Sequence, residues 1–351
     1  MTTRTHRVWG LMAWAAIAFL CAAAACSGSD SESAAPAPRA TAAPAAAQPQ
    51  PAAPEPRATE APVAAQPQPA APSPPAPAAQ KPAPQMMFFL GDSITKAGGY
   101  VRIIKDELVK QNPTNPPQIH NFGHMSETVS GLSEAYHPGR RPCVLNWVDA
   151  VLAEKPNWVI VCYGINDGIY HPFNEKRFAA YQAGIETLIK KVNAVGARLV
   201  ILTPPPFASA GPPFPPGTDA AAREALLAKA NAEAEAEAEK DPTKFGYRSP
   251  YAYYDQVLAR YCKWLLTLDG RDGVSVVDIR TPMLARIKEA YGGDAIHPNG
   301  CGHAIMAETF LKQWPAIQAK AKYRSASPNR KQDKPPVVPP PNSVTVEPRH
   351  S

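Results

Sequence analysis

The sequence predicts a parallel β-sheet covered by helices on both faces. Five short apolar segments have the length and composition of buried strands, and helical patterns lie between most of them. Alternation of buried strands with amphipathic helices is typical of α/β domains with a parallel sheet. The five expected strands are 86–90, 118–121, 158–162, 198–202 and 274–278.

The first half of the expected domain alternates regularly. The strand at 86–90 ends at Gly91, and the helix predicted over 100–111 carries Val101, Ile104 and Leu108 on one face. A weak strand at 118–121 precedes a helix expected over 144–152. The strand at 158–162 is strongly apolar, and the pattern over 176–194 indicates a long amphipathic helix.

The second half contains an expected insertion, at about 204–270. The strand at 198–202 stops at three prolines, 204–206. The Ala/Glu/Lys-rich segment 219–240 predicts a solvated helix, and 251–268 predicts a helix that is aromatic on one side. These two helices either overhang the active site or form an insertion that never touches substrate. The strand at 274–278 and a helix over 304–313 close the domain.

Proline is concentrated at both ends of the chain, which has 42 prolines in 351 residues. The folded domain is therefore expected over 86–323. An Ala/Pro/Gln-rich linker with an imperfect repeat fills 27–85, and a second polar tail fills 324–351. Such segments bury too little apolar surface to fold, so we expect both to be disordered and the linker to be a semi-rigid spacer.

The N-terminal segment 1–26 has the features of an export signal. Arg4 and Arg7 precede an apolar run over 8–25, which ends in small residues before Cys26. The pattern is similar to the lipobox of bacterial lipoproteins, with Cys26 as the lipidated residue, although Ala23 stands where Leu is usual. Ordinary signal cleavage and an uncleaved anchor are the alternatives. All three place the domain outside the cytoplasm, in the cell envelope or secreted.

Charge and cysteine content point away from several classes of function. The net charge of +6 comes mainly from the two ends, and no basic cluster with interleaved aromatics occurs in the expected domain, so nucleic-acid binding is not expected. No CxxC pair occurs, and we expect no metal and no cofactor. The expected domain contains four cysteines, which are Cys143, Cys162, Cys262 and Cys301. They allow three ways of forming two disulfides, and the sequence does not choose among them. Cys162 is expected to be a buried thiol.

Four polar blocks fall after expected strands or on late loops. Since ligands bind beyond the carboxyl ends of the strands in a parallel α/β sheet, these blocks are expected to meet. In chain order they are Gly91-Asp92-Ser93, Asn121-Phe122-Gly123, Gly164-Ile165-Asn166-Asp167 and Asp294-Ala295-Ile296-His297.

The order and content of these blocks resemble the SGNH hydrolases, also called GDSL esterases and lipases. The resemblance extends over most of 86–314. It implies a three-layer α/β/α, flavodoxin-like fold and hydrolysis of esters. It also implies Ser93 as nucleophile, Asp294 and His297 as its triad partners, and an oxyanion hole of Ser93, Gly123 and Asn166. One departure is Ser126, which stands where the second block often has a later Gly.

The chemistry of these residue types agrees with the resemblance. A serine hydroxyl needs a base to take its proton, and a histidine titrates near neutrality. An Asp three residues before that His can fix the ring tautomer, although Asp294 could instead cap the final helix. The backbone N–H groups of Ser93 and Gly123 and the Asn166 amide are suitable oxyanion donors. Asp167 is expected to shape its loop.

Several functions fit these residues. The first is a serine ester hydrolase that removes acyl or acetyl groups, with acetylated carbohydrate as a candidate substrate. A lipase, a lysophospholipase or an acyltransferase could use the same site. A non-catalytic envelope protein that binds glycans is the other class, and the complete set of Ser, Asn, Asp and His argues against it.

Overall fold

The computed structural model describes residues 83–209 and 211–325. Its sheet has five parallel strands in the order β2-β1-β3-β4-β5, which confirms the predicted parallel sheet and is the flavodoxin-like order. All five expected strands are present with shifts of at most two residues at their ends. They are β1 (Met86–Gly91), β2 (Gln118–Gly123), β3 (Trp158–Cys162), β4 (Arg198–Leu202) and β5 (Ser275–Val277).

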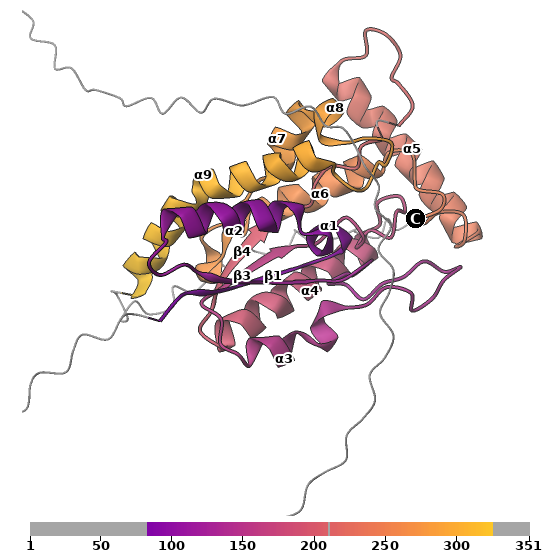
Figure 1. Cartoon of the computed structure of the whole chain (residues 1–351). Coiled ribbons are helices and arrows are strands. Elements are labelled where there is room, and N and C mark those ends of the chain that lie inside the picture. The colour runs from indigo at the N-terminus through magenta and orange to yellow at the C-terminus, as the bar shows by residue number, and fades with distance from the viewer. Residues whose placement is uncertain (1–82, 210, 326–351) are drawn as a thin grey trace, which may run out of the picture. The chain divides into compact units, whose positions relative to one another are not determined.

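Helices cover both faces of this sheet and complete three layers (Figure 1). Helices α2 (Gly99–Gln111) and α9 (Gly300–Ser325) pack side by side over one face. Helices α3 (Val148–Leu152) and α4 (Glu175–Ala194) cover the other. The shorter helices are α1 (Ser93–Ala97), α7 (Arg280–Ala285) and α8 (Ile287–Ala290), with 3-10 turns at Val144–Asn146 and Arg271–Gly273.

The strand register aligns the ends of β1, β2 and β3. Gly91, the last residue of β1, lies opposite Gly123 on one side and Cys162 on the other. The segments that leave these three strands therefore emerge at the same edge of the sheet. This edge brings three of the four polar blocks together, as the sequence predicts.

Two predicted helices differ from the observed ones. The helix expected over 144–152 is divided at Trp147, whose φ of −135° is not helical. The last helix runs to Ser325 instead of ending at Gln313, and contains Pro315. Trp314 and Ile317, on either side of that proline, are both buried. The apolar face therefore continues past Pro315, and its packing outweighs the cost of one lost helical hydrogen bond.

The two helices of the insertion differ in their relation to the core. Helix α5 (Ala220–Lys240) lies at the rim of the domain, and only Ala234 and Ala238 of it are buried, which confirms the predicted solvated helix. Helix α6 (Tyr254–Leu266) is instead part of the core, where Tyr261 stacks on Tyr181 of α4 with 4.6 Å between ring centroids. The second half of the insertion is therefore part of the packed core of the domain.

All four cysteines of the domain are free thiols, and Cys162 is buried as predicted. No helix within 83–209 and 211–325 is long and apolar enough to cross a membrane. The predicted signal over 1–26, Cys26, nearly all of the linker and nearly all of the tail lie outside the described residues.

Candidate active site

Ser93, His297 and Asp294 form a continuous chain of hydrogen bonds. The Ser93 hydroxyl lies 2.8 Å from Nε2 of His297, and Nδ1 of the same ring lies 2.5 Å from Oδ2 of Asp294. Ser93 and His297 are 204 residues apart in the chain. This geometry allows His297 to take the hydroxyl proton while Asp294 holds the opposite ring nitrogen.

The turn after β1 places Ser93. Gly91 ends the strand, and the Asp92 side chain accepts a hydrogen bond of 2.9 Å from the Ile94 N–H, which caps helix α1. Ser93 is the first residue of that helix, so its N–H has no intrahelical acceptor. Hydroxyl and N–H of Ser93 are therefore both available at the carboxyl edge of the sheet.

Asp294 orients His297 and the turn between them. Its Oδ1 accepts from the Ile296 N–H at 2.7 Å and from the His297 N–H at 3.3 Å. Partial burial would raise the pKa of Asp294, but these N–H groups and the His297 ring outweigh it and hold the pKa below its ordinary value. Asp294 does not cap the final helix, which begins at Gly300 and where Asn299 accepts from the Gly302 N–H.

Asn166 is buried and fixed through both ends of its amide. Its Oδ1 accepts from Nη1 of Arg141 and from the Tyr170 hydroxyl, each at 2.9 Å. Its Nδ2 donates one hydrogen bond, of 3.2 Å, to the Glu127 carbonyl, so the second hydrogen of this amide remains available. Since the Arg141 guanidinium can only donate, it determines which end of the amide is the acceptor and which is the donor.

A buried ion pair lies behind Asn166. The Arg141 and Glu134 side chains have no exposed surface and lie 2.5 Å apart. The guanidinium also lies over the Tyr170 ring, at 5.2 Å from its centroid. Burial alone would raise the pKa of Glu134, but Arg141 outweighs burial and lowers it. No sequence motif marks this pair, because both residues lie in a loop without periodicity.

Helix α6 supports the same loop from the insertion. The Tyr254 hydroxyl donates to the Ile165 carbonyl at 2.9 Å, and its ring packs against that of Tyr170 at 4.9 Å between centroids. The insertion therefore supports the residue before Asn166 and one of the groups that holds Asn166.

Gly123 lies at the site, but its N–H is already paired. It donates to Oδ1 of Asn121 at 2.9 Å, while Nδ2 of Asn121 donates to the Thr95 carbonyl at 2.7 Å. A Cβ atom at position 123 would lie 2.2 Å from the backbone nitrogen of Lys96, so only glycine fits there. In this structure Gly123 allows close contact of β2 with α1, and it is not a free donor like the Ser93 N–H.

Ser126 lies in the loop of the second block. Ser126 has φ of 59°, the left-handed conformation that glycine adopts more easily. Asp167 holds Val129 and Ser130, which follow Ser126 in this loop. Its Oδ1 accepts a hydrogen bond from the N–H group of each, at 2.9 Å. Asp167 thus has the loop-shaping role that the sequence predicts.

His303 packs against the core near the site. Its Nδ1 accepts from the Tyr100 N–H at 3.3 Å, and the two rings stack with 6.1 Å between centroids. His303 therefore has a packing role.

Asp92 makes stability depend on pH. Burial raises its pKa from 3.8 to about 7. An acid whose pKa is higher in the folded chain stabilises the fold below its unfolded pKa, and this contribution is lost as pH rises through the folded value. We therefore expect the contribution of Asp92 to the free energy of unfolding to be lost between about pH 4 and pH 8. Asp92→Asn, which keeps the cap, should remove that part of the pH dependence, on the order of 2–4 kcal/mol.

Urea unfolding of both proteins at several pH values measures this effect. Asp106→Asn, on the exposed face of α2, is the matched control and should behave as the wild type. A pH dependence in Asp92→Asn equal to that of the wild type would show that Asp92 is not the responsible group.

Comparison with known proteins gives a family and one curated relative. The GDSL-like lipase/acylhydrolase family matches residues 89–243. An acetylxylan esterase of Geobacillus stearothermophilus is 22% identical over 254 residues, which cover 65% of this chain and 93% of that protein.

Solved structures are similar at low identity. A crystal structure of the Geobacillus stearothermophilus acetylxylan esterase has a TM-score of 0.44 and 21% identity, and covers 66% of this chain and 94% of its own. A gut microbial diltiazem-metabolizing enzyme has a TM-score of 0.48 and 19% identity, over 66% of this chain and 46% of its own. The fold assignment rests on the observed sheet order.

Proposed function

The chain belongs to the SGNH (GDSL-type) hydrolase superfamily and is a carboxylic ester hydrolase, and from this premise we propose that Ser93, His297 and Asp294 are its catalytic triad. The observation that carries the proposal is the chain of two hydrogen bonds, of 2.8 Å and 2.5 Å, that joins the three side chains. Ser93 and Asn166 supply the oxyanion donors. The Gly123 N–H becomes a third donor only when it no longer donates to the Asn121 side chain.

The proposed reaction proceeds in two steps. His297 takes the proton of the Ser93 hydroxyl as its oxygen attacks the ester carbonyl, and then gives that proton to the departing alcohol. The Ser93 N–H and the free hydrogen of the Asn166 amide stabilise the negative oxygen of the tetrahedral intermediate. The acyl group remains on Ser93. Water, deprotonated by His297, then attacks it, and the carboxylic acid leaves as His297 returns the proton to Ser93.

We propose acetylated carbohydrate as the substrate class. The side chains of His297 and Asp294 are 35% and 52% exposed, so this part of the site is open to solvent. An open site admits a short acetyl group on a bulky polymer, whereas a long acyl chain needs an enclosed apolar surface to leave water. The acetylxylan esterase among the relatives supports the same class.

A profile over acyl chain length tests this proposal. Purified protein should hydrolyse 4-nitrophenyl acetate with a kcat/KM at least about tenfold above that for the octanoate, because the site offers little apolar surface to the longer chain. It should also release acetate from acetylated xylan, and Ser93→Ala should abolish both reactions. A preference for octanoate would indicate a lipase and contradict the acetyl-ester assignment.

We further propose that Cys26 is lipidated and anchors the protein in the cell envelope. The basic start, the apolar run and the small residues before Cys26 support this. The protein should then fractionate with membranes and incorporate labelled fatty acid, and Cys26→Ser should lose both properties. An N-terminus mapped by mass spectrometry to an unmodified residue beyond Cys26 would indicate plain secretion. An N-terminus still at Met1 would indicate an uncleaved anchor.

A further inference from the structure

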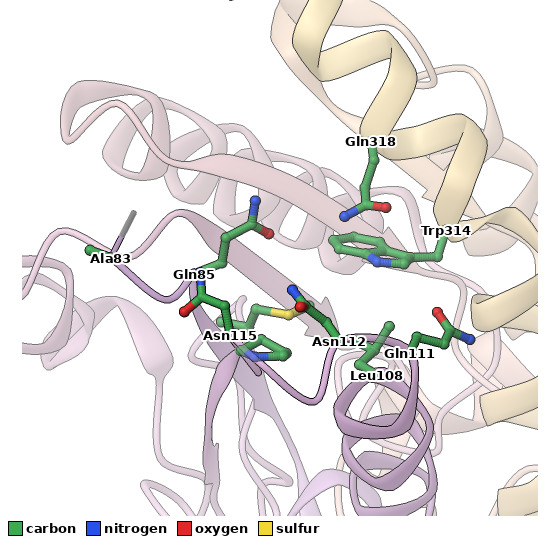
Figure 2. Close-up of a pocket in the computed structure, with 10 residues that line it drawn as sticks. Ala83, Gln85, Leu108, Gln111, Asn112, Asn115, Trp314 and Gln318 are labelled. Atoms are coloured by element: carbon green, nitrogen blue, oxygen red, sulfur yellow. The ribbon is translucent and has the colours of Figure 1, made fainter. Parts of the chain in front are cut away.

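A cavity lies at the start of β1, whereas Ser93 follows the end of that strand, and Figure 2 shows residues that line the cavity. Its volume is about 430 Å³, and its walls come from the start of β1, the end of α2 and the C-terminal part of α9. Ser93 follows the other end of β1. Because β1 has six residues, the cavity and Ser93 are separated by about 20 Å of strand.

Carboxamides and an indole give this cavity its chemical character. Met87, Leu108 and Trp314 form the floor of the cavity and are at most 5% exposed. The lining contains no charged side chain from the described part of the chain. Its polar and aromatic members are Gln85, Gln111, Asn112, Asn115, Gln318 and Trp314, which Figure 2 shows around a common space.

Several of these amides have hydrogen-bonding capacity to spare. Gln85 accepts from the Trp158 indole at 3.3 Å, which leaves its NH₂ group available. The NH₂ group of Gln111 donates to Glu107 at 3.2 Å, which leaves its carbonyl available. Asn112 and Gln318 make no side-chain hydrogen bond within 83–209 and 211–325. The cavity therefore presents unused donors and unused acceptors.

We propose that this cavity is a non-catalytic binding site for a neutral oligosaccharide. Each sugar hydroxyl both donates and accepts, which matches carboxamides that offer NH₂ and carbonyl groups together. The C–H surface of a sugar ring can lie against the small exposed parts of Leu108 and of the Trp314 indole at the floor of the cavity. The lack of charge in the lining disfavours anionic ligands, whose buried charge would find no partner. The volume falls within the range of small-molecule sites.

Such a site would act together with the catalytic one on a polymer. A polysaccharide held at the amino edge of the sheet raises the local concentration of its own esters near Ser93. The effect applies to polymeric substrates and not to small esters, which cannot reach both sites. Only this consequence for turnover rests on the proposed function.

Binding can be measured without turnover in the full-length Ser93→Ala protein. We expect calorimetric titration with xylo- and cello-oligosaccharides to give saturable binding, and oligogalacturonate to bind at least tenfold more weakly. Adding Asn112→Ala and Gln318→Ala should raise the Kd for the neutral sugars at least tenfold. Gln182→Ala, on helix α4, is the matched control and should leave the Kd unchanged. Trp314 is left intact because it packs on Trp158 and Phe310 in the core.

Three outcomes would overturn the proposal: equal binding by the protein with and without the two substitutions, equal binding of the anionic oligosaccharide, and no saturable binding at all. The last includes the case in which another part of this chain fills the cavity. With Ser93 present, the same two substitutions should raise KM for acetylated xylan and leave 4-nitrophenyl acetate turnover unchanged. If the wild type does not act on acetylated xylan, the proposed substrate class is wrong. The calorimetric titration still tests whether the cavity binds neutral oligosaccharides.

Discussion

Ser93→Ala is expected to lower the kcat for acetyl esters by about 10⁴–10⁶-fold, the range seen when a serine nucleophile or its histidine is removed. The loss is large because no covalent acyl-enzyme can form without the hydroxyl. His297→Ala should cost a similar factor, since the hydroxyl lies 2.8 Å from the only ring nitrogen that faces it. The double variant should be little worse than either single one, because the two residues act as a unit.

A fluorophosphonate probe checks the same assignment directly. The wild type should be labelled at Ser93, identified by peptide mass spectrometry, and both His297→Ala and Ser93→Ala should remain unlabelled. His303→Ala is the matched control, because His303 contacts Tyr100 instead of Ser93. Labelling at another serine, or full labelling without His297, would remove the triad assignment.

Asn166→Ala is expected to slow turnover by about 10²–10³-fold, the cost of one oxyanion donor, with a much smaller change in KM. This variant also removes the acceptor of the Tyr170 hydroxyl and of one Arg141 N–H, which should lower stability by about 1–3 kcal/mol. Activity therefore has to be compared at a temperature at which both proteins are folded.

Asn166→Asp separates catalysis from support of the loop. The ionised carboxylate still accepts from Arg141 and Tyr170 but offers no hydrogen to the oxyanion or to the Glu127 carbonyl. If Asn166 is an oxyanion donor, both variants are slow. If Asn166 acts only through its carbonyl oxygen, Asn166→Asp restores activity and the donor role is wrong. Asn193→Ala, on α4, where the side chain donates to the Asp272 carbonyl, is the control for loss of an asparagine.

The sequence was sufficient to predict those elements and site residues whose positions depend on neighbouring residues in the chain. The five strands follow from short apolar segments that are buried on both faces, and the polar blocks stand next to them in the chain. Asp294 and His297 are three residues apart, so their contact needs only one turn of backbone. The site residues that the sequence predicts are therefore those at strand ends or within a short motif.

The tertiary structure alone decided how those residues are held. Arg141 bonds to Asn166 from 25 residues away, and Tyr254 bonds to the preceding carbonyl from 89 residues away, and such contacts have no periodicity. The paired N–H of Gly123 depends on where the Asn121 side chain points, which its contact with Thr95 determines. Sequence patterns record which residues are apolar or polar and how they are spaced, because burial selects for both. They do not record which polar groups meet once the chain is folded, because that depends on the packing of elements that are distant in the sequence.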